Sequence, residues 1–283
     1  MRGKLFPSAL EGVGAERDFY EVRDLIPEDI EVIRRAVIDF ASDALKPVYE
    51  ELLAAFALVA SANRYIADNP DCPEQWKTAV REAVANLDED YHAAIEHDLQ
   101  IALRSMRSGS TEFFNDAEIA GPFLRALSVQ YLRTKKLRNA MLNQVQAPIA
   151  GADMERIWGP MCHMLAMNVG ASLFRDRSHF RMRLLENMSE IPFLTGDQPV
   201  LNVNENYDAM GKPQELELYY PLTPKLALLY TRVSSPLSAL STAVDEAQVV
   251  SYNRQIVENS HEQVYSNSGE SLEAWKELSA TME

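Results

Sequence analysis

The chain has 283 residues, of which 47% are hydrophobic, and a formal net charge of −15. A chain of this size can bury a substantial core, and we expect a single domain. The negative charge disfavours a nucleic-acid or anionic-membrane binder. The longest apolar run, Leu52–Ala60, is too short to cross a bilayer. Residues 1–20 lack the apolar stretch of a signal peptide, and Cys72 and Cys162 have no metal-type spacing. We therefore expect a cytoplasmic protein with reduced thiols.

The charge is unevenly distributed along the chain. Residues 117–183 carry ten Lys or Arg against four Asp or Glu, so the remainder is strongly acidic. Two interpretations follow: the middle presents a basic face on an acidic body, or basic and acidic segments pair across packed helices.

The first part of the chain predicts a short strand and then helices. Residues 18–22 suit a strand, and the sequence is expected to begin inside a domain, with an N-terminal portion missing. Ile26-Pro27-Glu28-Asp29 is typical of a helix start, and apolar residues recur at helical spacing over 30–44. Pro47 is expected to end or kink this helix. The next helix, Tyr49–Tyr65, is Ala-rich and mostly apolar, which predicts that it is well buried.

Helical spacing continues to about residue 174. Three further helices are predicted over Glu74–Arg107, Asp116–Gln146 and Asp153–Phe174, so that residues 27–174 form five or six helices. The second is interrupted at most at Gly121-Pro122, and Asp153 is expected to cap the third.

The hydrophobic period then changes from helical to alternating. Phe180, Met182 and Leu184 alternate with arginines, which predicts a strand. Four more short strands are predicted at Ile191–Thr195, Val200–Val203, Leu216–Tyr220 and Leu226–Thr231. Their short connections favour antiparallel pairing. Helical spacing returns at Val244–Tyr265 and Glu270–Met282. The predicted fold is α+β: mostly helical (27–174 and 244–281), with one small, largely antiparallel sheet (178–231).

The best candidate for chemistry is the turn Gly196-Asp197-Gln198-Pro199. Pro199 biases the preceding residue to an extended conformation, and Gly196 permits backbone geometry that other residues resist. This turn would hold Asp197 in a fixed position. Three roles are open for its carboxylate: an acid/base, a metal ligand, or a cap that accepts hydrogen bonds from backbone N–H groups. No second carboxylate stands at a spacing diagnostic of a catalytic pair.

A basic helical stretch supplies candidate anion-binding residues. Its members are Gln130, Arg133, Thr134 and Arg138. Thr134 and Arg138 share one helix face, which could meet a phosphate or Asp197. Alternatively, Arg133 and Arg138 form salt bridges to the acidic helices.

Histidines near carboxylates invite a metal interpretation, which the spacing disfavours. His92 and Glu96 share a face with Glu89, but His97 lies about 140° round the helix from His92. The sequence lacks both the zinc-protease spacing and a second Glu-x-x-His. We predict no metal site and no cofactor, and we interpret the buried-looking His163 as a core histidine.

The order of several short motifs resembles a known family, the bacterial proteins grouped as domain of unknown function 4238. The matching pieces are Phe19-Tyr20, Ile95-Glu96, Gln130-x-x-Arg133-Thr134-x-x-x-Arg138, Phe193-Leu194-Thr195-x-Asp197-x-Pro199, Pro221–Pro224 and Asn253. The family usually opens with a His-x-x-Pro-Gln segment, whereas here Leu5-Phe6-Pro7 has neither the histidine nor the glutamine. The resemblance implies an uncharacterised bacterial protein, and the missing segment argues against catalysis.

Three functional hypotheses remain open. The first is a protein that binds a small anionic ligand or a protein partner through Asp197, Arg133 and Arg138, with Gln130 and Thr134 beside them. The second is a metal- or acid-assisted phosphodiester or phosphoryl hydrolase that uses Asp197, with the two arginines clamping the anion. The third is a scaffold without a site, in which the polar motif stabilises a helix–sheet junction.

Overall fold

The structure is a computed structural model that describes residues 24–144, 149–204 and 216–280. Within these residues the helices are α1 Pro27–Ile33, α2 Lys46–Asp68, α3 Glu74–Arg107, α4 Ala117–Leu132, α5 Lys135–Gln144, α6 Met154–Arg175, α7 Glu246–Asn259 and α8 Gly269–Ala280. A π-helical turn, Arg34–Ile38, continues α1. The strands are β1 Phe180–Asn187, β2 Thr195–Gly196, β3 Leu201–Asn202, β4 Leu218–Thr223, β5 Leu226–Arg232, β6 Ala243–Val244 and β7 Val264–Tyr265.

The α+β class is confirmed, and the sheet is only partly as predicted. The helix predicted over Val244–Tyr265 is shorter in the structure: α7 ends at Asn259, and Val264–Tyr265 form a strand. Five strands run in the order β3-β4-β5-β1-β6, with the first three pairings antiparallel. The last pairing, between β1 and β6, is parallel, so the sheet is mixed. β2 and β7 form a separate antiparallel pair. The predicted strand over Ile191–Thr195 is wrong except at its last residue, and the strand suggested at 18–22 lies outside the described residues.

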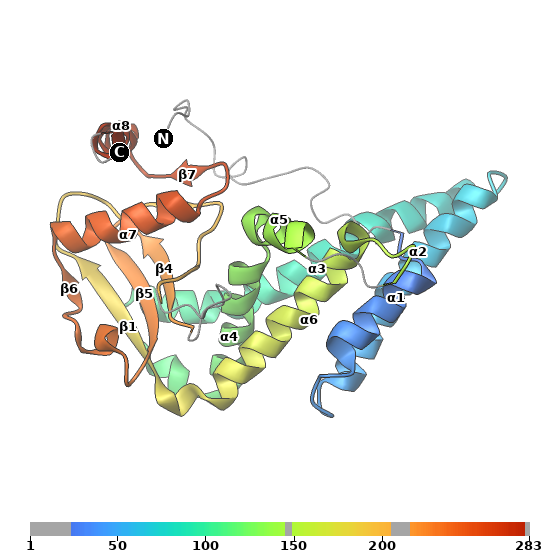
Figure 1. The fold of residues 1–283 in the computed structure, drawn as a ribbon, viewed down its shortest axis with the longest axis horizontal. Coiled ribbons are helices and arrows are strands. Elements are labelled where there is room, and N and C mark those ends of the chain that lie inside the picture. Colours follow the sequence, from blue (N-terminus) through green and yellow to red (C-terminus); the bar gives the residue numbers. More distant parts are fainter. Residues whose placement is uncertain (1–23, 145–148, 205–215, 281–283) are drawn as a thin grey trace.

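Helices cover both faces of the sheet (Figure 1). On one face, Phe180, Leu228 and Tyr230 pack with α3, α4 and α6 in a buried cluster. On the other face, Tyr219 and Leu229 pack beneath α7 and α8. A third cluster joins α1, α2 and the first half of α6. Because α6 contributes to two clusters, it links the sheet part to the outer helices.

A close helix crossing fixes α4 against α6. A Cβ atom at Gly170 would lie 2.9 Å from the Cα of Arg125, a distance too short for a real contact. A larger residue at position 170 would therefore push the two helices apart. Pro122 lies inside α4 and Pro160 inside α6, so neither Gly-Pro pair ends its helix, as the sequence had allowed.

Pro47 does not end the first helix. That helix ends in the π-helical turn at Ile38, and Pro47 stands in the first turn of α2, where a missing N–H group costs no intrahelical bond. Asp153 caps α6 as predicted, by accepting a 2.9 Å bond from the Glu155 N–H.

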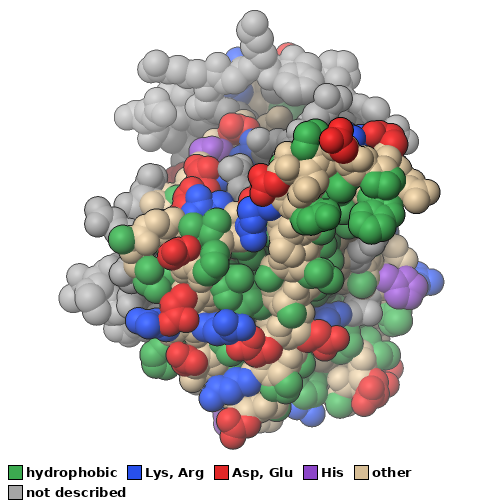
Figure 2. Space-filling view, turned by 90° about the vertical axis from the view of Figure 1, so that its right-hand side faces the viewer, with side chains coloured by type: hydrophobic (Ala, Val, Ile, Leu, Met, Phe, Trp, Pro, Cys, Tyr) green, Lys and Arg blue, Asp and Glu red, His purple; other side chains and the backbone are tan. Residues whose placement is uncertain are grey.

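The helix predicted over Tyr49–Tyr65 is well buried on one side only. Tyr49 and Phe56 are buried in the cluster with α6, whereas Leu58 and Tyr65 are 69% and 57% exposed. Among the described elements, the π-helical turn, α3 and α6 pack against α2, and its buried residues Tyr49, Leu53, Phe56 and Ala60 lie on one side of the helix. The other side leaves apolar residues in contact with water, and Figure 2, which views the molecule from there, shows hydrophobic side chains between charged ones.

Candidate functional site

The Gly196–Pro199 turn lies at a junction between the helical part and the sheet part. The junction comprises the end of α4, the start of α5, the turn Gly196–Pro199 and the loop that follows α7. Gly196 is essential to the approach of the turn to this loop, because a Cβ there would lie 3.0 Å from the Gln263 carbonyl oxygen and closer still to Ser260. The pairing of β2 with β7 joins the same two segments.

The Asp197 carboxylate accepts three backbone N–H bonds from consecutive residues. Its Oδ1 lies 2.8 Å from the nitrogen of His261, and its Oδ2 lies 2.6 Å and 3.0 Å from the nitrogens of Glu262 and Gln263. The Asp197 N–H in turn donates to the Gln263 carbonyl at 3.1 Å. Such N–H groups beyond a helix end have no helical partner, and a carboxylate is a strong acceptor for them. Asp197 therefore acts as a cap, although on a loop distant in sequence rather than on its own turn.

Gln198 joins the turn to the end of α4. Thr134 Oγ1 donates to Gln198 Oε1, and Gln198 Nε2 donates to the carbonyls of Tyr131 at 3.1 Å and Val200 at 2.9 Å. Both Thr134 and Gln198 are buried. Gln198 thus satisfies the carbonyl of Tyr131 at the point where the helix predicted over Asp116–Gln146 is divided into α4 and α5.

Two lysines at the start of α5 contact the end of α7 and the loop that follows it. Lys136 Nζ donates to the Glu258 carbonyl at 3.0 Å and to Asn259 Oδ1 at 3.1 Å, where the C-terminal end of the helix dipole favours a cation. Burial lowers the pKa of Lys136, against the opposing effect of Asp197 and Glu258. Lys135 Nζ lies 3.0 Å from Glu262 Oε2, and this bond lowers the pKa of Glu262.

The predicted arginines do not join Asp197 within the described contacts. Arg133 Nη1 lies 3.7 Å from Glu96 Oε1 on α3, and its charge opposes the burial that raises the pKa of Tyr220. Arg138 lies on α5, half-buried. Gln130 is buried within α4. Thr134 is thus the predicted residue that the structure brings into direct contact with the Gly196–Pro199 turn.

Two asparagines secure the segment that leads into the turn. Asn253, fully buried on α7, accepts from the Leu194 N–H at 2.8 Å and donates to the Pro192 carbonyl at 2.9 Å. Asn187, at the end of β1, donates to the carbonyls of Ile191 at 2.7 Å and Pro224 at 3.1 Å. Asn253 was marked by the family pattern. Asn187 was missed, and an isolated asparagine at a strand end carries no distinctive sequence signal.

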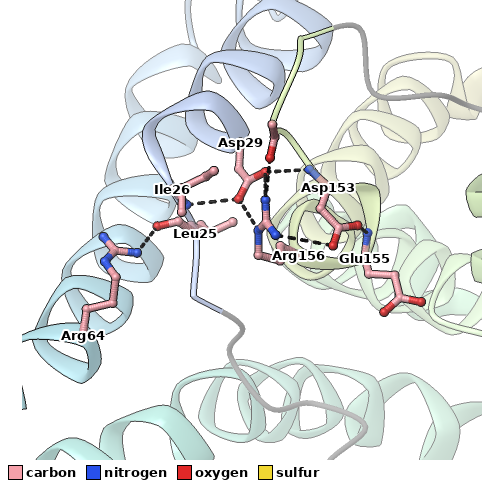
Figure 3. A network of polar contacts seen from close by, with 8 residues as sticks. Leu25, Ile26, Asp29, Arg64, Asp153, Glu155 and Arg156 are labelled. Carbon is pink, nitrogen blue, oxygen red and sulfur yellow. Dashed lines mark hydrogen bonds and ion pairs between the residues drawn. The ribbon is translucent and has the colours of Figure 1, made fainter. Parts of the chain in front are cut away.

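A second polar network fastens the outer helices (Figure 3). Asp29 on α1 is fully buried and accepts from Arg156 Nε at 2.7 Å and Nη2 at 3.1 Å. It also accepts from the N–H groups of Ile26 at 3.0 Å and Asp153 at 2.9 Å. Burial alone would raise the pKa of Asp29, but the Arg156 guanidinium and the two N–H donors outweigh it and lower the pKa.

Several residues of the basic middle pair with acids outside it. Arg133 meets Glu96, Lys135 meets Glu262, and Arg156 meets Asp29. These contacts agree with the interpretation that basic and acidic segments pair across the packing. Among the described residues, no group of three or more His, Cys, Asp or Glu side chains is arranged to hold a metal ion. His163 is buried with its ring 4.2 Å from that of Tyr91, and the side chains of Glu89 and His92 lie outside the described residues.

Comparisons with known proteins place the chain in a family without giving it an activity. None of the described helices is long and apolar enough to cross a membrane. Neither the curated proteins nor the solved structures gave a match. One family model matches residues 2–270, which is most of the chain. The chain therefore belongs to the family described as "protein of unknown function (DUF4238)".

Proposed function

We propose that the Gly196–Pro199 turn is a structural latch between the helical part and the sheet part, and that the chain works as a non-catalytic scaffold. The observation that carries this proposal is the set of three backbone N–H bonds to the Asp197 carboxylate. A general base must present a free oxygen to the proton that it abstracts. Both oxygens of Asp197 are instead directed at the protein's own backbone.

The other motif residues support the same role. Gln198 and Thr134 bind each other and the end of α4, and Asn253 binds the backbone before the turn. These contacts are between parts of the chain that are far apart in sequence. Three residues of the family pattern, Thr134, Asp197 and Asn253, thus make contacts that join distant segments of the chain.

Ligand binding and phosphoryl hydrolysis at Asp197 remain the competing proposals. Both require Arg133 or Arg138 to face an anion near Asp197. Arg133 pairs with Glu96, and an incoming anion would have to compete with the Asp197 carboxylate for the loop N–H groups. Of the two arginines, Arg138 is therefore the one that such a ligand would engage.

A thermal-shift experiment separates these proposals. Wild type, Asp197→Ala and the control Asp39→Ala are melted alone and with Mg²⁺, inorganic phosphate or ATP. Bonds to a charged acceptor stabilise by about 1.5–3 kcal/mol in general. Because Asp197 is half-buried, we expect a net loss of about 2 kcal/mol for Asp197→Ala, or about 4–8 °C.

The scaffold proposal predicts that Asp197→Ala melts early, that Asp39→Ala does not, and that none of the additives shifts wild type. Asp39 is a suitable control because it is exposed on the turn after α1. Stabilisation of wild type, but not of Asp197→Ala, by phosphate or ATP would contradict the scaffold proposal and favour a binding site.

A further inference from the structure

Three polar side chains where α3, α4 and β4 meet make no hydrogen bond with any residue that the structure describes. They are Gln130 and Arg133, which stand one turn apart at the end of α4, and Tyr220 on β4. Gln130 is only 8% exposed, and the Arg133 side chain is 22% exposed. Buried polar groups are normally hydrogen-bonded, so a group of this kind without a partner needs an explanation.

The fold directs these side chains toward one another. Side chains alternate between the two faces of a strand, so Tyr220 lies on the same face of β4 as Leu218, toward the core shared with α3 and α4. Arg133 reaches α3, where its Nη1 lies 3.7 Å from Glu96 Oε1. Arg107, also on α3, acts on the pKa of the Tyr220 hydroxyl together with Arg133, so both guanidinium groups lie near that hydroxyl.

The contact with Glu96 leaves the donors of Arg133 available. At 3.7 Å the two atoms are beyond hydrogen-bond distance, and 56% of the Glu96 side chain is exposed. A guanidinium offers five N–H donors in a planar fork, which matches the two oxygens of a carboxylate. Arg133 is therefore prepared for an acceptor that the described part of the chain does not supply.

We propose that Gln130, Arg133 and Tyr220 bind the carboxylate group of a small organic acid. The Arg133 fork holds both carboxylate oxygens, and the Tyr220 hydroxyl and the Gln130 amide donate further hydrogen bonds to them. The Tyr220 hydroxyl is a donor only while it is protonated. Burial raises its pKa, against the opposing charges of Arg133 and Arg107, so the hydroxyl stays protonated at neutral pH.

The charge around the site selects a carboxylate over a phosphate. Arg107 and Arg133 are positive and Glu96 is negative, so the cluster has one positive charge in excess. A carboxylate carries a single negative charge, which this excess neutralises. A phosphate group carries about −1.5 to −2 at neutral pH and would leave uncompensated negative charge beside Glu96.

Half-buried leucines flank these polar groups and define the rest of the ligand. Leu103 stands between Glu96 and Arg107 on the same face of α3. Leu222 follows Tyr220 on the same face of β4. Both leucines pack at the edge of the same core cluster. The ligand is therefore an acid with a short apolar body, of the class of aromatic or medium-chain carboxylic acids.

An NMR titration with benzoate tests this site. The signals of benzoate should report binding to wild type with a dissociation constant in the millimolar range, as expected for so small a ligand. In the spectrum of the protein, the Arg133 Nε–H signal should shift. Benzamide, which has the same shape without the charge, should not bind, and an equal concentration of inorganic phosphate should not displace benzoate.

An arginine variant and its matched control test the guanidinium fork. Arg133→Lys keeps the charge but loses the planar fork, and it should weaken benzoate binding by at least about tenfold. Arg81→Lys is the control, since Arg81 lies on α3, pairs with Glu74 and has a side chain that is 69% exposed. It should bind benzoate as wild type does.

Two further variants separate a binding role from a structural one. Tyr220→Phe removes a hydroxyl without a partner in the described part of the chain, so the urea midpoint should not fall, whereas benzoate should bind about tenfold more weakly. Glu96→Gln removes the acid that competes for Arg133, so benzoate should bind up to about fivefold more tightly.

Three results would overturn this proposal. One is the absence of benzoate binding to wild type up to about 50 mM. Another is equal binding of benzamide, or displacement of benzoate by phosphate, either of which would exclude a carboxylate site. The last is wild-type affinity in Arg133→Lys or Tyr220→Phe. The site is independent of the latch, so folded Asp197→Ala should bind benzoate as wild type does, and the two proposals can fail separately.

Discussion

Removing the carboxylate of Asp29 should destabilise the protein by about 3 kcal/mol. Breaking one partner out of a buried ion pair typically costs about 3–5 kcal/mol, because the other charge is left uncompensated. Asp29 is fully buried, but Arg156 keeps 26% of its side-chain surface exposed, which places the expected loss at the lower end. We predict this loss for Asp29→Ala, measured as a lower urea midpoint at unchanged slope.

The control for this prediction lies on the same helix. Glu31 pairs with Arg35 at 2.6 Å, but 44% of the Glu31 side chain and 68% of the Arg35 side chain are exposed. Glu31→Ala should therefore cost less than about 0.5 kcal/mol. The double variant Asp29→Ala/Arg156→Leu should recover part of the loss, since it removes the uncompensated guanidinium. A loss below about 1 kcal/mol for Asp29→Ala, or no recovery in the double variant, would refute the reasoning.

The same pair predicts a pH dependence with a definite sign. The pKa of Asp29 is lowered in the folded protein from its ordinary value of 3.8, so the unfolded chain binds this proton more readily. The stabilisation is then fully present above the ordinary value and is lost as pH falls through the lower folded-state pKa. The stability difference between wild type and Asp29→Ala should stay constant from about pH 7 to about pH 5 and shrink below about pH 4.

Three further predictions follow from packing and hydrogen bonding, each measured by urea unfolding. Gly170→Ala should destabilise by about 1–3 kcal/mol because its Cβ would meet the backbone of α4, whereas Gly159→Ala in the same helix, with open space around it, should stabilise by about 0.5–1 kcal/mol. Equal effects of the two glycine substitutions would contradict the helix crossing described. Asn253→Ala should cost about 2 kcal/mol, because two buried backbone groups of the 192–194 segment lose their partners. Thr134→Val should cost about 1 kcal/mol, and wild-type stability in this variant would mean that the bond to Gln198 is unimportant.

The helical part was predictable because its signals are local. The apolar period over Glu74–Arg107 predicts α3 with the observed bounds, and Asp153 predicts the start of α6. The break between α4 and α5 was not predictable. At this point the chain contacts Gln198, which lies 64 residues beyond Thr134, and no local pattern carries that contact.

The sheet and the candidate site were predicted less completely for the same reason. The alternating pattern predicts β1, and the apolar run between turns predicts β5. β6 and β7 have two residues each, too few to show a pattern. The turn at Asp197 was recognised, and so was capping as one of its roles. Its partners, the N–H groups of residues 261–263, could not be identified, because backbone donors leave no trace in the sequence.

Hydrogen exchange at the amides of His261, Glu262 and Gln263 tests the structural role of Asp197 most directly. These residues are exposed, so protection of their N–H groups depends on the Asp197 carboxylate. The account predicts that all three are protected in wild type and exchange at least about tenfold faster in Asp197→Ala. Amides that exchange freely in wild type, or equally slowly in both proteins, would contradict the proposal that Asp197 is a structural residue. Ligand binding by Asp197 would then be the favoured hypothesis.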